Sequence, residues 1–485
     1  MAPPHPDSPW VPATTADGQI VAGKQGSPGA SAESGYVLPA NQAMSQVPMQ
    51  PRLDPDHVYT LSELIDIAQS NSPSTRVAWN SARNAALASG IVESAYLPNL
   101  SASVVGGYQS VHNENSALGF NGSNDTSGRG VISALSLQWL LFDFGERSAL
   151  VDAARQGSVI SNIAFTAAHQ KLIYEVSLAY YANAASRARL GFAEESLKNA
   201  DSVQAAAEDR FKQGIGGIVE VDQARQVTAQ ARLVKVQAQG ALQDTDLALL
   251  AAMGIPPVTT IKVEDISGRK LSANAIPSVD RIVSDALSRR PDVLGAYAAK
   301  QASLANLRAA QAEFLPKLFL SGTGAYASNG LAVSALPGIG QQSPTVNLSG
   351  SELGGTILLG VTIPIYDGGT RQALLEQART RADSADAVLA QVRDEAMREV
   401  VKAQNSLKTS LAAYEASQAL VAAAQTTFDA ALEAYRNGVG SITDATVAET
   451  QLLQAKSALT DAHSAALSAA ATLALAVGTL GGSPS

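Results

Sequence analysis

Residues 58–480 contain one sequence pattern written twice in the same order, and this duplication limits the possible folds more than any single residue does. Three co-linear matches at a nearly constant offset are not expected by chance. The two halves must therefore adopt related structures. The matching segments are YLPNL at 96–100 with FLPKL at 314–318, FDFG at 142–145 with YDGG at 366–369, and FKQGIG at 211–216 with YRNGVG at 435–440.

The composition favours close packing of helices over a bulky globular core. A length of 485 residues would suggest about three ordinary domains, but the duplication predicts two related halves. Hydrophobic residues make up 46% of the chain while aromatic residues make up only 5%, so alanine supplies much of the apolar content. Alanine-rich helices can approach one another closely.

Several classes of function are disfavoured by what the chain lacks. The net charge of −9, without a cluster of lysines and arginines, argues against a nucleic-acid partner. The absence of cysteine excludes thiolate metal sites and a cysteine nucleophile. We expect no metal, no cofactor and no enzymatic activity, because the histidines lack ligand spacing and no catalytic constellation is visible. The histidines are His5, His57, His112, His169 and His463.

The distribution of proline divides the chain. Residues 1–55 are rich in proline, so we expect an extended or disordered arm there. The first repeat is predicted over residues 56–257 and the second over residues 278–480. An inter-repeat segment over 258–277 and a short tail over 481–485 complete the division.

Each half is predicted to contain helices of two lengths. An uninterrupted helical pattern covers residues 146–212 and 370–436, and at 1.5 Å per residue each would extend about 100 Å. A glycine-rich turn and a return helix of about half that length follow. An opening helix of similar half length ends at a Leu-Pro step, because the residue before proline disfavours the helical region. The opening helices are expected over 61–95 and 279–313, and the return helices over 219–252 and 442–477.

The pattern between the opening helix and the long helix changes to period two, which indicates strands. Each half thus offers one hairpin, with strands of about 10 residues that match a tilted strand crossing a bilayer. The connecting loops are expected to be long and polar. The strands are predicted over 100–109, 135–139, 318–327 and 357–363, and the loops over 112–130 and 328–355.

These elements predict the wall of a tube. The two short helices, laid end to end, match the long one, so each half can form an antiparallel helical hairpin with a β-hairpin at one end. Four strands cannot close a barrel, and an open strand edge is not tolerated in lipid. Three chains would give 12 strands, enough for an open lumen. The predicted fold is an α+β membrane protein, a trimeric 12-stranded β-barrel continued by a long α-helical barrel.

Over residues 58–480 the chain resembles the outer-membrane factors typified by TolC, the exit ducts of bacterial efflux pumps and type I secretion systems. The resemblance lies in the Leu-Pro step into a strand, the aspartate and glycine between strand and long helix, and the aromatic-x-x-Gly-x-Gly turn. It implies a homotrimer in outer-membrane lipid, with a periplasmic helical barrel and an equatorial belt that includes residues 254–277. It also implies a periplasmic adaptor (membrane fusion) protein and an inner-membrane pump of RND or ABC type.

The chain departs from this pattern at its start. The first residues contain neither the charged nor the apolar segment of a signal peptide, so export is absent or the signal lies outside this sequence. With no cysteine, we expect no N-terminal lipid anchor of the kind that some members carry.

Four glycines mark the turns at which the long helices reverse. Gly214, Gly216, Gly438 and Gly440 are explained structurally by the positive φ that a tight reversal requires. The resemblance adds a functional role, since these turns would form the periplasmic tips that contact the adaptor.

Two acidic residues begin the return helices at equivalent positions, and both have two interpretations. Glu220 and Asp444 can act as first-turn carboxylates, with Ser441 and Asp444 at capping-box spacing. The resemblance instead places them in a gate at the periplasmic end, where Tyr435 would bond across the tip to Glu220.

The gate implied by the resemblance is incomplete in this chain. Its second aspartate falls on Val447 and its arginine on Gly440, so we expect a weaker or differently built lock. The second half has the clearer capping motif and the longer outer loop, and we expect gating to be specified by these asymmetries.

Three aromatic residues in the predicted strands are candidates for the membrane interface. Tyr108, Trp139 and Tyr326 could form a girdle at the headgroup level, although ordinary strand packing also accounts for them.

We therefore predict a passive exit duct with an iris gate at its helical tips. The alternative is a soluble or extracellular coiled-coil structural protein such as a filament subunit, which would share the Ala, Gln and Ser content. That alternative does not explain the two apolar hairpins in register with the repeat.

Overall fold

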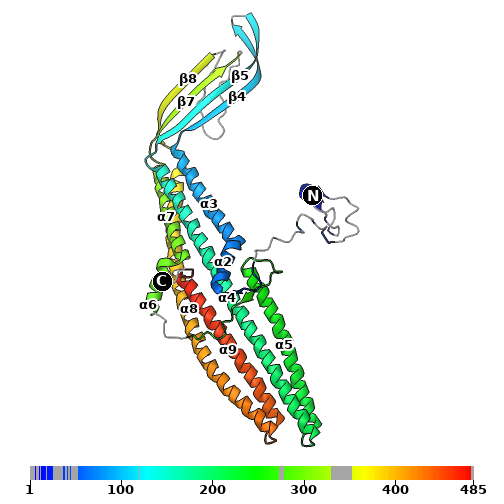
Figure 1. The fold of residues 1–485 in the computed structure, drawn as a ribbon. Helices are drawn as coiled ribbons and strands as arrows, with labels where there is room; N and C mark the ends of the chain where they lie inside the picture. The colour runs from blue at the N-terminus through cyan, green and yellow to red at the C-terminus, as the bar shows by residue number, and fades with distance from the viewer. Residues whose placement is uncertain are drawn as a thin grey trace.

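The computed structural model of the protein is elongated, with a β-sheet at one end and two helical tips at the other (Figure 1). Most of the arm expected over residues 1–55 lies outside the described residues, as do residues 272–277 and most of the second outer loop. The described residues are 53–117, 120–271, 278–328 and 352–481, with 6, 10, 12–17, 19–25, 36–38, 41 and 44 before them.

Two helices of 67 residues each, α4 and α8, run the length of the helical part. Two shorter helices lie end to end beside each of them: α3 and α5 pack on α4, and α7 and α9 pack on α8 (Figure 1). The predicted long helices and the predicted end-to-end arrangement of the short helices are confirmed. The bounds are α3 Pro73–Glu93, α4 Glu146–Lys212, α5 Ile218–Ala252, α7 Pro291–Ala312, α8 Thr370–Arg436 and α9 Ile442–Val477.

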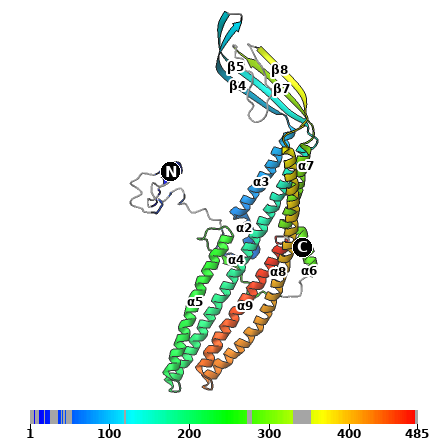
Figure 2. The ribbon, with the colours of Figure 1, turned by 180° about the vertical axis from the view of Figure 1, so that it is seen from behind.

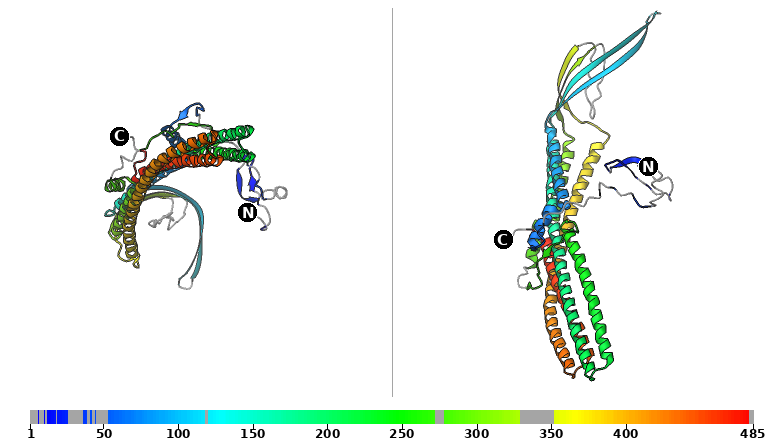
Figure 3. Two further views of the ribbon diagram at one scale, coloured as in Figure 1. Left: turned by 90° about the horizontal axis from the view of Figure 1, so that it is seen from below. Right: turned by 45° about the vertical axis from the view of Figure 1, so that its right-hand side comes forward.

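The helices of the two halves form one curved wall. α4 contacts α7 near the sheet and α9 toward the tips, so the halves meet along most of their length. The view from behind shows the same order of helices (Figure 2), and from below they lie along an arc (Figure 3).

Each opening helix is broken by a proline that the prediction overlooked. One helix was predicted over 61–95 and one over 279–313. The structure instead has α2 (Leu61–Asn71) before α3, and α6 (Val279–Arg289) before α7. Ser72 and Arg290 have ψ of 124° and 128°. Each precedes a proline, which excludes the helical region for the residue before it.

Each return helix ends against one of these breaks. Gly254 follows α5 and Gly478 follows α9, with φ of 71° and 75°, a region that favours glycine. A Cβ at Gly254 would lie 3.4 Å from Cα of Ser72, and a Cβ at Gly478 would lie 3.1 Å from the backbone of Arg289. The two glycines therefore allow the short helices of each half to meet end to end.

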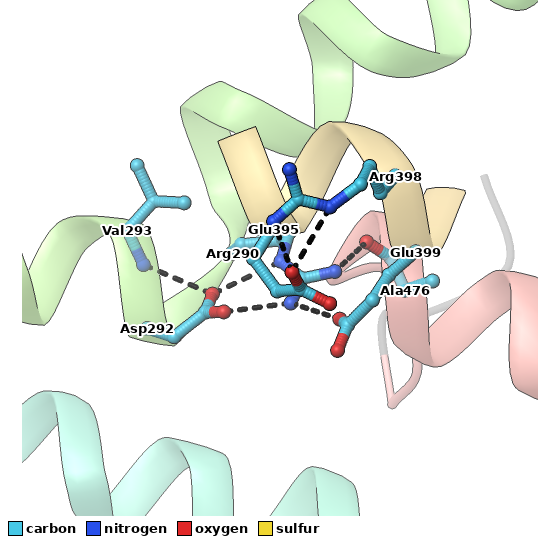
Figure 4. A network of polar contacts seen from close by, with 7 residues as sticks. All are labelled: Arg290, Asp292, Val293, Glu395, Arg398, Glu399 and Ala476. Atoms are coloured by element: carbon cyan, nitrogen blue, oxygen red, sulfur yellow. Dashed lines mark hydrogen bonds and ion pairs between the residues drawn. The ribbon is translucent and has the colours of Figure 1, made fainter. Parts of the chain in front are cut away.

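The joint in the second half also holds a buried arginine (Figure 4). Arg290 donates to carboxylate oxygens of Asp292 and Glu399, each at 2.6 Å, and to the carbonyl of Ala476 at 3.1 Å. One guanidinium thereby joins α7, α8 and α9, as its several donors permit. The first half has Ser72 in this place, so the two joints are not equivalent.

The long strands form one antiparallel sheet in the order β4-β5-β7-β8. Each half contributes one hairpin, as predicted, and β5 pairs with β7 between the halves. The halves therefore share the sheet as well as the helical wall. The bounds are β4 Asn99–Ala117, β5 Phe120–Phe142, β7 Lys317–Ala327 and β8 Glu352–Thr362.

The first hairpin is longer than predicted, and the loop expected over 112–130 is wrong. β4 and β5 have 19 and 23 residues and pair continuously through that region. Its Gly, Asn and Ser content indicated a loop, but ladder hydrogen bonds are made by the backbone and do not need apolar side chains. In the second hairpin, both strands have 11 residues, close to the predicted length.

An ion pair fixes the junction between β5 and α4. Asp143 accepts a hydrogen bond from Nε of Arg147 at 2.8 Å. Arg147 also donates to the carbonyl oxygens of Leu140 at 2.6 Å and Ala95 at 3.0 Å, and lies over the ring of Tyr96. Strand, opening helix and long helix are therefore bonded to a single buried side chain.

The second half repeats this junction in a more exposed form. Arg371 pairs with Asp367 at 2.9 Å and lies over the ring of Phe314. The carboxylate side chain of Asp367 is 32% exposed, against 6% for Asp143 in the first half. The duplicated FDFG and YDGG segments thus encode the same junction.

Smaller elements surround the midpoint of the wall. β3 (Val58–Tyr59) pairs in parallel with β6 (Lys262–Val263), which joins the first repeat to the inter-repeat segment. β1 (Pro12–Thr14) and β2 (Ile20–Gln25) form a short hairpin in the N-terminal arm. Among the described helices, none combines the length and apolar character needed to cross a membrane.

Replacing Arg147 should destabilise the fold more than replacing its repeat counterpart. Arg147→Ala leaves the buried Asp143 carboxylate without its cation, and loss of one partner of a buried pair costs about 3–5 kcal/mol. Arg371→Ala removes a better solvated pair and should cost less. Thermal unfolding of the detergent-purified variants by far-UV circular dichroism checks this order, and equal losses of Tm would contradict it.

Candidate functional site

The two tips share one backbone conformation. After α4, the amides of Ile215 and Gly216 both donate to the carbonyl of Arg210 at 3.1 Å. After α8, the amides of Val439 and Gly440 donate to the carbonyl of Ala434 at 3.0 Å. The sequence match between the turns therefore reflects a structural match.

Glycine is required at the four tip positions for two different reasons. Gly214 and Gly438 have φ of 75° and 77°, as the sequence predicted. Gly216 and Gly440 do not have positive φ, so the prediction was wrong for them. A Cβ at Gly216 would lie 3.2 Å from the Arg210 side chain, and one at Gly440 would lie 3.0 Å from that of Ala434. Close approach of the turn to its own helix requires glycine there.

The two acidic residues at the tips have different environments. Asp444 forms the predicted capping box, in which its amide donates to the Ser441 hydroxyl oxygen at 3.1 Å and its carboxylate accepts from that hydroxyl at 2.7 Å. In the first tip Gly217 occupies the cap position, and no side chain caps α5. Glu220 lies in the first turn of α5, as the structural interpretation predicted, but without a capping box.

Tyr435 is the buried centre of the tips. Its side chain is 1% exposed and packs in an apolar cluster drawn from α4, α5, α8 and α9. Its hydroxyl donates to Oε2 of Glu220 at 3.1 Å, so the structure brings these two predicted site residues together. Burial and the bond to Glu220 raise the pKa of Tyr435 to about 12, which keeps the hydroxyl a donor at neutral pH. Asp444 is exposed, bonded within its cap.

Arg210 completes this cluster and was missed from the sequence. Its Nη1 donates to the carbonyl of Tyr435 at 3.2 Å, and its guanidinium lies 5.0 Å from the centre of the Tyr435 ring. Its Nε is 4.0 Å from Oε2 of Glu220. In the alignment of the two repeats, Arg210 corresponds to Ala434. This difference between the repeats was the one sequence signal that could have identified Arg210.

Polar contacts continue from the tips along the seam between α4 and α9. The hydroxyl of Ser196 donates to Glu449, and both residues are 5% exposed. Nearby, Lys456 pairs with Glu195 at 2.7 Å. Burial raises the pKa of Glu449, against the opposing effect of the bond from Ser196.

One face of the sheet is apolar and exposed on all four strands. Side chains alternate between the faces, and residues paired across antiparallel strands share a face. The register therefore places most of the exposed apolar residues together and a face richer in Ser and Thr opposite them, where Val105 and Leu358 are also exposed. The apolar face contains Leu100, Val104, Val131, Leu135, Trp139, Tyr326, Leu353, Ile357, Leu359 and Val361, and the opposite face Ser101, Ser103, Ser136, Thr323 and Thr356.

The three candidate interface aromatics all lie on the apolar face, at separate heights. Tyr108 pairs with Arg129 and Tyr326 with Ser133, ten and six residues before Trp139 on β5. At about 3.3 Å per residue, the tyrosines lie about 33 Å and 20 Å along the strand from Trp139. Trp139 also donates to the carbonyl of Tyr96 at 2.9 Å, so it has a structural contact as well.

No cluster suited to a metal ion occurs in the part of the chain that the structure describes, where groups of three or more His, Asp or Glu are absent.

A long helical wall that carries an open sheet with one apolar face is the architecture of an outer-membrane channel subunit. The family model described as outer membrane efflux protein matches residues 64–255 and 282–479. The chain therefore belongs to the outer membrane efflux protein family. The two matched segments correspond to the two repeats.

Relatives of known name align over most of the chain. Protein CyaE of Bordetella pertussis is 27% identical over 416 residues, which cover 84% of this chain and 82% of CyaE. The cation efflux system protein CusC of Escherichia coli K12 is 26% identical over 70% of each chain. The outer membrane protein OprJ of Pseudomonas aeruginosa is 28% identical, covering 78% of this chain and 75% of OprJ.

Solved structures show the same fold. The crystal structure of CusC superposes with a TM-score of 0.73 at 24% identity and covers 89% of this chain and 96% of that one. The outer membrane protein VceC of Vibrio cholerae gives a TM-score of 0.70 at 22% identity, over 86% of this chain and 96% of VceC.

The buried Glu449 should make the stability of the seam depend on pH. The pKa of Glu449 is raised in the folded protein. Its contribution to the free energy of unfolding is therefore fully present below the ordinary carboxyl pKa of about 4.3 and is lost as pH rises through the raised pKa. Relative to Glu449→Gln, the wild-type Tm should therefore fall as pH rises. Asp201→Asn, which changes an exposed carboxylate on α4, is the control. Parallel curves for the wild type and Glu449→Gln would contradict the prediction.

Proposed function

We propose that the protein is the outer-membrane exit duct of a tripartite efflux pump or type I secretion system. Three chains would place their sheets edge to edge in a 12-stranded barrel, and their helical walls would continue it into the periplasm as one tube. Substrate would pass through without chemistry in this chain. Family membership and the names of the relatives CusC, a cation efflux system protein, and OprJ, an outer membrane protein, support export across the outer membrane.

The observation that carries this proposal is the difference between the two faces of the sheet, one holding most of the exposed apolar residues and the other richer in Ser and Thr. An apolar band facing lipid and a polar lining facing the lumen are what a membrane barrel requires. The open edges β4 and β8 need partners, because unpaired strand groups are costly in lipid. Neighbouring copies of the chain would supply them.

The tips are the proposed docking site for a periplasmic adaptor protein, itself coupled to an inner-membrane pump of RND or ABC type. The turns around Gly214, Gly216, Gly438 and Gly440 would form this contact. Two exposed apolar side chains project there, Ile215 at 62% and Val439 at 83% exposure. Exposed apolar residues at a fixed turn suit a protein contact.

The proposed gate uses Glu220, Tyr435 and Asp444. The bond between Tyr435 and Glu220 joins the two tips of one chain. Asp444 is exposed in the first turn of α9, and three copies around a trimer axis would concentrate negative charge at the end of the tube. An iris-like movement of the helical hairpins would open the duct.

The filament alternative assigns no role to the apolar sheet face. Purification separates the two functions, since a duct should require detergent and elute as a trimer, while a filament subunit should be soluble without it. A monomer that stays soluble in the absence of detergent would refute the duct.

Removing the tip carboxylates should open the duct. Glu220→Ala breaks the bond to Tyr435, and Asp444→Ala removes exposed charge, so the double variant should raise single-channel conductance in planar lipid bilayers several-fold. Asp201→Asn is a matched control that removes one exposed negative charge from α4 away from the tips. Unchanged conductance of the double variant would remove the gate and leave the duct in place.

A further inference from the structure

One cation contacts both tips of the same chain. Arg210 belongs to the first tip, in the last turn of α4, and its side chain is only 14% exposed. From there it reaches the second tip, where it bonds to the carbonyl of Tyr435 and covers the Tyr435 ring. Arg210 therefore joins the tips in addition to the bond between Tyr435 and Glu220, and it has no symmetric partner, because its counterpart in the other repeat is Ala434.

The contact with Tyr435 combines three interactions. The guanidinium donates a charge-assisted hydrogen bond to a carbonyl, attracts the face of the aromatic ring, and lies near the carboxylate that accepts from the Tyr435 hydroxyl. Arg210 thus holds Tyr435 by its backbone and ring while Glu220 holds it by its hydroxyl. Separating the tips would break all of these contacts together.

We propose that Arg210 is a latch: it positions Tyr435 against the first tip, and the two tips of one protomer part only when its guanidinium leaves Tyr435. This inference rests on the proposed duct and its gate. It adds a positively charged residue to a gate otherwise made of Glu220, Tyr435 and Asp444.

The latch is built to release. Among the described residues, Nε of Arg210 is buried without a hydrogen-bond partner, 4.0 Å from Glu220. By contrast, Arg147 at the sheet junction has its Nε bonded to Asp143 at 2.8 Å and two further bonds to carbonyls. An incompletely paired arginine costs less to withdraw than a fully paired one.

Gly438 gives the latch its space. A Cβ at Gly438 would lie 3.0 Å from Nη1 of Arg210, whereas a Cβ at Gly214 would meet nothing within 4 Å. The two glycines have nearly equal φ, 77° and 75°, so an alanine at either position carries the same backbone strain. Gly438→Ala therefore adds a steric contact with Arg210 that Gly214→Ala does not.

Single-channel conductance of trimers in planar lipid bilayers tests the latch. Arg210→Ala should raise conductance several-fold, and Arg210→Lys should restore it only in part, because an ammonium can bond the carbonyl but cannot stack on the ring as guanidinium does. Gly438→Ala should exceed Gly214→Ala in conductance. Adding Gly438→Ala to Arg210→Ala should have no further effect, since both act through one contact.

A chemical readout separates tip opening from general loosening. The chain has no cysteine, so Ala445→Cys, in the buried cluster around Tyr435, is the only thiol in that variant. Maleimide should label it faster when Arg210→Ala is also present. Ala68→Cys, in the buried cluster where α2, α4 and α5 meet, should label slowly with or without Arg210.

The outcomes distinguish the latch from the duct. Arg210→Ala trimers with wild-type conductance and slow labelling at Ala445→Cys would overturn the latch. If the double variant Glu220→Ala with Asp444→Ala still raised conductance in that case, the proposed gate would be supported without a latch at Arg210. Faster labelling at both cysteines would also overturn the latch, because it would make Arg210 a general stabiliser. Failure to form any pore would refute the proposed function itself.

Discussion

The rest of the molecule depends on how the sheet is joined to the helices. Arg147 bonds at once to Asp143 at the strand end, to Leu140 within the strand and to Ala95 in the short 3-10 turn that follows α3. These bonds fix the rotation of α4 relative to the sheet. The second half repeats the arrangement with Asp367 and Arg371.

Much of this architecture was accessible from the sequence because it depends on local periodicity and on repetition. The long helices were predicted to the residue, since glycines stand at both of their ends. The breaks at Pro73 and Pro291 were missed although the rule that produces them was applied at the Leu-Pro steps. The extended β4 and β5 were missed for a different reason, because side-chain composition does not report backbone pairing between polar segments.

The tips show why a site is harder to predict than a fold. Tyr435 and Glu220 were found through the resemblance, and the structure brings them within hydrogen-bond distance. Arg210 follows neither a motif nor a repeat match, and its meeting with Tyr435 joins residues 225 positions apart. Glu449 was missed in the same way, since its burial depends on how α9 packs against α4. Such contacts arise from tertiary packing, which one sequence does not display.

The end-to-end joints of the short helices have a mechanical consequence. Among the described helices, α4 and α8 continue past the joints, while α5 and α9 stop at Gly254 and Gly478. Each hairpin below the joints is thus a lever of 35 or 36 residues, about 50 Å long. A pivot of about 5° at the joint would carry a tip through about 4 Å. A bend too small to disturb the sheet would therefore displace the tip by more than the length of a hydrogen bond.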